Sequence, residues 1–179
     1  MNMRGWAQIA VAGALLVGGA HSALAQTAQK APAPAAKTST VITGWNVTCA
    51  TPQAAGKLLC EVNNSVLVKP SNSRFVSVAI RPDGISGKKV LVASLPHGVL
   101  FTAGISLKID GKDAGKLQML TSDQNGSYAR TSMSAELAGA MKAGKTFTVV
   151  FDGTNAKRFT VGLPLAGFTA AYNKMSGGS

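Results

Sequence analysis

The chain has 179 residues, and its 18 Lys and Arg against 7 Asp and Glu give a formal net charge of +11. This length suits one domain with a sizeable core and argues against a set of several independent domains. The kind of binding partner that this positive charge suggests depends on the compartment of the protein, and the N-terminal residues indicate that compartment.

The first 25 residues predict a secretory signal. Arg4 precedes an apolar run from Trp6 to Gly19, and Ala23-Leu24-Ala25 forms a small-x-small cleavage site. The run is shorter than the about 20 apolar residues that a membrane-spanning helix needs. We therefore expect a periplasmic, secreted or surface-associated protein with no transmembrane segment once residues 1–25 are removed.

Residues 26–40 predict a flexible tether. The stretch is rich in Ala and Pro and contains no aliphatic side chain larger than Ala. Such a segment cannot bury enough apolar surface to offset the loss of chain entropy. The folded domain is predicted to span residues 41–176.

Alternating apolar residues from Val41 onward predict a series of short strands separated by turns. Pro82-Asp83-Gly84, Asp110-Gly111, Asn125-Gly126 and Asp152-Gly153 are the strongest turn signals. The predicted strands include residues 41–49, 58–68, 76–80, 88–94, 105–109, 117–121, 147–151 and 159–163.

Two stretches follow a helical pattern instead. Ser134 to Gly144 has a capping serine, an early acid, a late lysine and a terminal glycine. Near the C-terminus, Phe168, Ala171, Tyr172 and Met175 fall on one helical face. The whole pattern predicts an all-β antiparallel β-sandwich with one or two short helices that cover an open end.

The two cysteines predict a structural disulfide. Period-two alternation puts Val41, Trp45, Val47 and Cys49 on one strand face and Leu58, Cys60 and Val62 on one face of the next strand, so both thiols should face the interior. A metal pair and free thiols are the alternatives. A metal needs more ligands than these cysteines and His97 supply, and a spacing of eleven matches no zinc motif. In an oxidising compartment a disulfide should stabilise the fold by about 2 to 3 kcal/mol.

Five lysines are candidates for anion binding. Lys108, Lys112 and Lys116 flank the Asp110-Gly111 turn, and Lys88-Lys89 begin another strand. They have two interpretations, solvated protection of exposed strands or a convergent anion-attracting surface. In an exported protein the second interpretation points to an anionic envelope or host-surface component and away from nucleic acid.

No catalytic constellation is evident. His97 lies between Pro96 and Gly98, as a turn residue would, and no nucleophile, base and orienting group occur together. Asp83, Asp110, Asp123 and Asp152 each lie at or beside a glycine-containing turn. We expect no enzyme activity, no metal and no cofactor. The alternatives to an interaction protein are a structural or chaperone-like periplasmic factor and, more distantly, a hydrolase in which two carboxylates converge in space.

Four sets of short motifs occur along the chain: Trp45-x-Val47-x-Cys49 with Cys60, Leu95-Pro96-x-Gly98-Val99, Ile109-Asp110-Gly111 and Leu163-Pro164-Leu165-x-Gly167-Phe168-x-x-Ala171. In this order and spacing they resemble the invasion-associated locus B family of small exported alphaproteobacterial proteins. The resemblance implies a periplasmic or surface-exposed β-domain without known catalysis, linked in some pathogens to invasion of host cells. Many members of this family carry a second cysteine pair where this chain has Ser122 and Ser127. The resemblance therefore implies that these two serines occupy the positions of a disulfide that this chain lacks.

Overall fold

The computed structural model describes residues 39–51, 58–84 and 86–177. The predicted signal, residues 1–25, and residues 26–38 of the predicted tether lie outside these ranges. All described residues belong to one unit of the chain, Lys37–Ser179.

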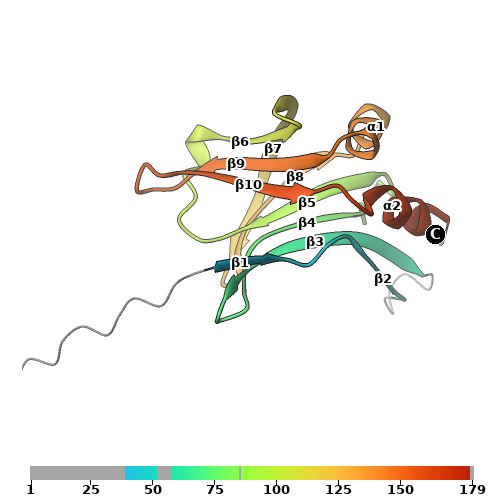
Figure 1. Ribbon diagram of the computed structural model, residues 1–179, viewed down its shortest axis with the longest axis horizontal. Coiled ribbons are helices and arrows are strands. Elements are labelled where there is room, and N and C mark those ends of the chain that lie inside the picture. The colour runs from blue at the N-terminus through green and yellow to red at the C-terminus, as the bar shows by residue number, and fades with distance from the viewer. Residues whose placement is uncertain (1–38, 52–57, 85, 178–179) are drawn as a thin grey trace, which may run out of the picture. The chain divides into compact units, whose positions relative to one another are not determined.

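Ten strands in the described residues form one antiparallel sheet (Figure 1). Their order across the sheet is β1-β3-β4-β5-β8-β7-β6-β9-β10, and β2 also pairs with β3. The strands are β1 (Ser39–Ile42), β2 (Asn46–Ala50), β3 (Leu59–Lys69), β4 (Ser73–Pro82), β5 (Lys89–Leu95), β6 (Ile105–Ile109), β7 (Lys112–Asp123), β8 (Gly126–Ser132), β9 (Thr146–Asp152) and β10 (Arg158–Pro164).

The predicted period-two alternation builds the core. In β4, Val76, Val78 and Ile80 are fully buried, and in β6 the inward residues Ile105 and Leu107 are almost completely buried. Successive side chains of a strand point to opposite faces, so these strands leave their other face for polar residues or for additional contacts.

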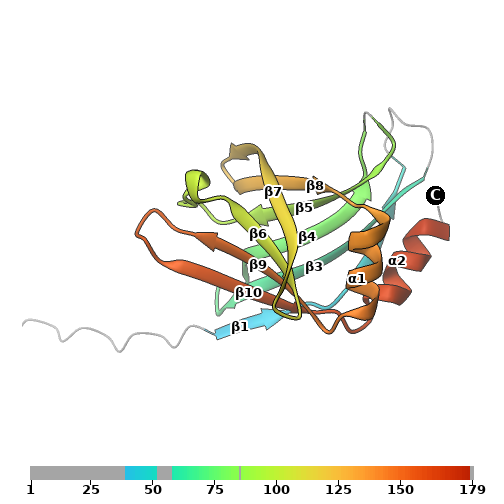
Figure 2. The ribbon, with the colours of Figure 1, turned by 90° about the horizontal axis from the view of Figure 1, so that it is seen from above.

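Strand β7 connects the two layers of the sheet. Leu117 of β7 pairs with Ile105 of β6, while the next residue, Gln118, pairs with Arg130 of β8. The sheet therefore curls over at β7 into a nearly closed, barrel-like arrangement (Figures 1 and 2). The predicted all-β antiparallel class is confirmed, and the two layers expected of a sandwich are parts of this single sheet.

The predicted turns differ in how they form. Asp110 and Gly111 both have positive φ, 49° and 81°, as a two-residue type I′ hairpin requires. Gly126 instead begins β8, and the turn that precedes it consists of Gln124 and Asn125. The turn after Asp152 is longer than the Asp-Gly pair alone predicts, because β10 begins only at Arg158.

Both predicted helices are present, and they lie side by side at one end of the sheet (Figure 2). Helix α1 (Ala135–Ala143) begins after Ser134, whose Oγ accepts a hydrogen bond from the Leu137 amide at 3.0 Å. Helix α2 (Phe168–Gly177) contacts β2 and β3 and buries the four residues that share its predicted apolar face, Phe168, Ala171, Tyr172 and Met175. A short 3-10 turn, η1 (Phe101–Ala103), precedes β6. No helix in the described part of the chain has the length and apolar character needed to cross a membrane.

The N-terminal strand divides into two. Val41 and Trp45 were expected on one continuous strand, but β1 ends at Ile42 and β2 begins at Asn46, with Gly44 between them at φ +79°. Val41 is 43% exposed because β1 lies at the edge of the sheet. Trp45 packs edge-on against Phe168 of α2, with ring centroids 4.9 Å apart, and covers the end of the core.

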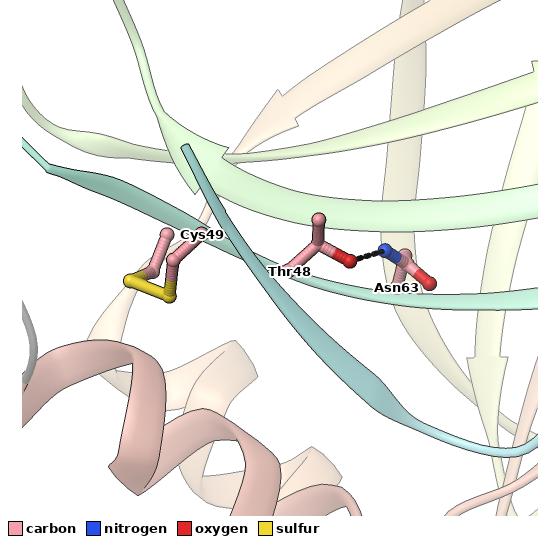
Figure 3. Close-up of a disulfide and its surroundings, with 4 residues drawn as sticks. Thr48, Cys49 and Asn63 are labelled. Carbon is pink, nitrogen blue, oxygen red and sulfur yellow. Dashed lines mark hydrogen bonds between the residues drawn. A yellow bond between two sulfur atoms is a disulfide. The ribbon is translucent and has the colours of Figure 1, made fainter. Parts of the chain in front are cut away.

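Cys49 and Cys60 form the predicted disulfide, with an S–S distance of 2.08 Å (Figure 3). The two residues lie directly opposite each other on β2 and β3. Cys60 is 2% exposed, but Cys49 is exposed, so the prediction that both residues are interior is wrong for Cys49. The reason is that β2 pairs only with β3 in the described chain, and its other side has no neighbouring strand.

Candidate functional site

Two adjoining depressions lie on the outer face of the sheet, meaning the side of β4, β5, β8 and β7 that points away from the core. We call the first the outer groove. It has a volume of about 550 Å³, and the residues that matter most in its lining are Glu61, Arg81, Val90, Val92, Leu120 and Arg130. The second, the basic depression, has a volume of about 300 Å³ and is lined by Lys88, Lys116, Gln118 and Arg130, among others. Asp83, Val90 and Arg130 line both.

Strand alternation explains why basic residues line the basic depression. Ala129 of β8 is fully buried, so the following residue, Arg130, points to the outer face. Lys116 of β7 precedes the buried Leu117 and therefore also points outward. Lys88 comes from the loop that leads into β5. Three cations that are distant in sequence thus meet at one place.

Asp83 holds the loop that carries Lys88. Its Oδ2 accepts hydrogen bonds from the Ser86 hydroxyl at 2.8 Å and the Ser86 amide at 3.3 Å. Its backbone amide donates to the Lys88 carbonyl at 2.7 Å. Oδ1 of Asp83 lies 3.5 Å from Nη1 of Arg130. This partly exposed ion pair contributes at most about 1 kcal/mol to stability, but it orients the Arg130 side chain.

The five candidate lysines do not form one surface. Lys88 and Lys116 line the basic depression, and Lys108 points to the same face as Lys116, because Lys116 pairs with Ser106, two residues before Lys108. Lys89 points the other way because it precedes Val90, an outward-facing residue of β5, by one position. Its Nζ donates to the Ser176 hydroxyl at 2.7 Å and lies 5.0 Å from the centre of the Tyr172 ring.

Lys112 also lies apart. It pairs with Ile109, whose side chain is in the core, and it lines a separate depression of about 470 Å³ beside α1 together with Asp113 and Glu136. Ala114 has no partner in β6, because Gly115 pairs with Leu107 and Asp113 pairs with Lys108. This extra residue interrupts the alternation of β7, so Lys112 and Lys116 point to different faces.

Arg81, Arg130 and Leu120 also line these depressions and were not among the predicted site residues. The two arginines follow the buried residues Ile80 and Ala129, and this alternation was the available signal that they point outward. The position of Leu120 had no such signal. It lies at a register shift between β7 and β8, and its side chain is 48% exposed.

The aspartates at predicted turns have structural partners. Asp110 accepts hydrogen bonds from the amides of Lys145 and Thr146, at 3.1 and 2.8 Å. Asp152 accepts two from the Arg158 guanidinium, at 2.8 and 2.9 Å, and these bonds hold the pKa of Asp152 below its ordinary value. Asp123 accepts from the Asn125 amide at 2.7 Å.

His97 and the acidic residues do not assemble a metal site in the described chain. Nε2 of His97 lies 3.2 Å from the Gln124 carbonyl oxygen, in the turn where Gly98 has a φ of +80°. No cluster of three or more His, Cys, Asp or Glu that could hold a metal ion occurs among the residues that the structure describes.

A family model and a solved structure match this chain. A family model described as invasion associated locus B (IalB) protein matches residues 45–176. The crystal structure of invasion associated protein B from Bartonella henselae is similar with a TM-score of 0.65 and 18% identity, over 79% of this chain and 96% of that chain. At this identity the likeness shows the fold. No curated protein matches the chain.

Proposed function

Because the chain belongs to the invasion-associated locus B family, we propose that it is an exported, non-catalytic protein that contacts an anionic component of the bacterial envelope or of a host surface. The disulfide and the predicted signal support the exported location, since disulfides persist in oxidising compartments. The name of the family, and that of the Bartonella henselae protein, support a role in invasion.

The observation that carries the proposal is the basic depression. Lys88, Lys116 and Arg130 come from three separate segments and line one concave surface, with Asp83 as the acidic neighbour. Cations gathered in this way attract phosphate or carboxylate groups more strongly than cations scattered over a surface. The large positive net charge of the chain adds long-range attraction.

Sedimentation with lipid vesicles tests the proposal. We expect the purified protein to bind phosphatidylglycerol vesicles, to bind phosphatidylcholine vesicles weakly, and to lose binding as salt rises above roughly 0.15 M, where the Debye length is about 8 Å. Each lysine near an anionic surface contributes about 1 kcal/mol, so Lys88→Ser with Lys116→Ser should weaken binding about thirtyfold.

The matched control is Lys112→Ser with Lys174→Ser, which removes the same charge from exposed positions that do not line the basic depression. An equal loss of affinity in both double variants would mean that only net charge matters. Absence of vesicle binding by the unaltered protein would reject contact with anionic lipid surfaces.

A structural or chaperone-like periplasmic role is the second candidate. The outer groove favours it, because a concave, partly apolar surface can hold an exposed apolar segment of another molecule. Suppression of aggregation of an unfolded client protein, lost in Leu120→Ser but kept in Lys116→Ser, would support this second role over the first.

A further inference from the structure

The outer groove has a different lining from the basic depression. Val92 lines the groove although it is only 7% exposed, and it does not belong to the cluster of buried side chains that forms the core. Val90 and Val92 lie in adjacent outward positions on β5, and Leu120 reaches the groove from β7. These three side chains form an apolar strip.

Leu120 is placed there by the irregular pairing of β7. Met119 pairs with Ala129 and Thr121 pairs with Tyr128, which leaves Leu120 without a partner in β8. A bulge of this kind redirects a side chain, and here it directs a large apolar side chain into a groove at 48% exposure. Leu120 is one of six large apolar side chains that are exposed among the residues that the structure describes.

Arg81 adds a charged group to the groove. Its guanidinium makes no hydrogen bond and no ion pair with any residue that the structure describes, whereas Arg130, the other groove arginine, is held by Asp83. Glu61, on the neighbouring strand β3, also lines the groove, and its Oε1 is 3.4 Å from Nδ2 of Asn63. Arg81 therefore offers a planar donor set that fits a carboxylate.

We propose that the outer groove binds a free single-chain anionic amphiphile of the fatty-acid class, with the carboxylate at Arg81 and the hydrocarbon chain on Val90, Val92 and Leu120. The volume of about 550 Å³ lies within the range of small-molecule sites, roughly 300 to 1,000 Å³. The apolar strip favours an acyl chain, and the guanidinium of Arg81, which has no ion-pair partner among the described residues, favours an anionic head group. Val90 lines both depressions, but Arg81 and Leu120 do not line the basic depression, so variants at these two positions test this inference separately from vesicle binding.

Titration calorimetry with monomeric dodecanoate and its neutral counterpart dodecanol tests the inference. We expect dodecanoate to bind saturably and more tightly than dodecanol. Arg81→Gln should weaken dodecanoate binding about tenfold, since it removes a charge-assisted hydrogen bond, and should leave dodecanol unaffected. Glu61→Gln should tighten dodecanoate binding, because a like charge is removed.

Two further variants locate the site. Leu120→Ser should weaken both ligands, and it should not affect folding because the side chain is largely exposed. Arg74→Gln removes the same charge from the same strand outside the groove, and it should bind like the unaltered protein. Nuclear magnetic resonance shifts on adding dodecanoate should concentrate at the amides around Arg81 of β4, Val90 and Val92 of β5, and Leu120 of β7.

Two results would overturn the inference. The first is the absence of saturable dodecanoate binding, and the second is equal weakening by Arg81→Gln and Arg74→Gln. Dodecanoate binding that survives in Lys88→Ser with Lys116→Ser, while vesicle binding is lost, would separate this site from the proposed surface interaction.

Discussion

Asn64 is a polar side chain near the centre of β3. It lies on β3 between the inward residues Val62 and Val66 and is fully buried. Its Oδ1 is 3.4 Å from the Thr43 hydroxyl, while its Nδ2 has no partner in the described part of the protein. A buried donor without a partner costs about 1 to 3 kcal/mol.

Replacement of this amide should stabilise the domain. We expect Asn64→Leu, which has a similar shape and no donor to satisfy, to raise the free energy of unfolding by about 1 kcal/mol in a urea titration. Asn63→Leu, on the opposite face of the same strand, is the control and should give no gain. A loss of stability in Asn64→Leu would mean that its amide is hydrogen-bonded to an internal water.

At the scale of elements, β7 and β8 are joined by two serines. Ser122 and Ser127 lie directly opposite each other, and their hydroxyl oxygens are 3.1 Å apart. Ser127 is 2% exposed, so the hydrogen bond lies partly inside the protein. The two positions that the family resemblance predicts for a second disulfide thus hold a pair of hydroxyl groups in contact.

These positions should accept a disulfide. We predict that Ser122→Cys with Ser127→Cys becomes oxidised on export and stabilises the domain by about 2 kcal/mol, the value for closing a short loop. Alkylation followed by mass measurement should find no free thiol at either position. Ser122→Cys with Ser132→Cys, which are not opposite each other, should keep both thiols. Free thiols in both double variants would contradict the register of β7 and β8.

Sequence patterns predicted which segments form strands and helices, but they did not predict which strands pair with each other. Alternation of apolar residues identified β4 and β6, and capping residues identified α1, because these signals are local. The pairings of β5 with β8 and of β6 with β9 join distant segments, and no local pattern specifies them. For this reason the sequence identified the candidate lysines, but it did not predict that Lys88, Lys116 and Arg130 line the same depression.

The sequence also did not predict the two irregularities in the pairing of β7. A bulge arises from a mismatch between two paired strands, so it cannot be identified from the sequence of one strand alone. The positions of Lys112 and Leu120 both follow from such irregularities. The sequence therefore named individual lysines as anion-binding candidates but did not predict their arrangement in space. The outer groove was not predicted.

At the scale of the whole domain, Trp45 connects the two ends of the sheet. Its Nε1 donates a hydrogen bond of 2.7 Å to the carbonyl of Pro164, the last residue of β10. Strands β1 and β10 are the two ends of the strand order, and Trp45 lies between β1 and β2. One side chain thus helps to hold the curled sheet together.

Loss of this connection should weaken the domain as a whole. We expect Trp45→Phe to lower the free energy of unfolding by about 1 to 2 kcal/mol, because it removes a hydrogen bond and part of the contact with Phe168. Phe101→Leu, at a residue that is 46% exposed, is the control and should cost little. Hydrogen exchange should show faster opening of β10 in Trp45→Phe, and unchanged exchange there would contradict the proposed connection.

The place of α2 in the chain also determines when the domain can be completed as the chain emerges, N-terminus first, into the compartment where it folds. Hairpins such as β3–β4 and β6–β7 contain adjacent segments, so they can pair as soon as both strands have entered the compartment where the domain folds. Phe168 and Met175, both fully buried in the finished core, emerge only after all ten described strands. Until they arrive, the surfaces of β2 and β3 that contact α2 remain uncovered, and the nascent domain is open to proteases and chaperones at this end.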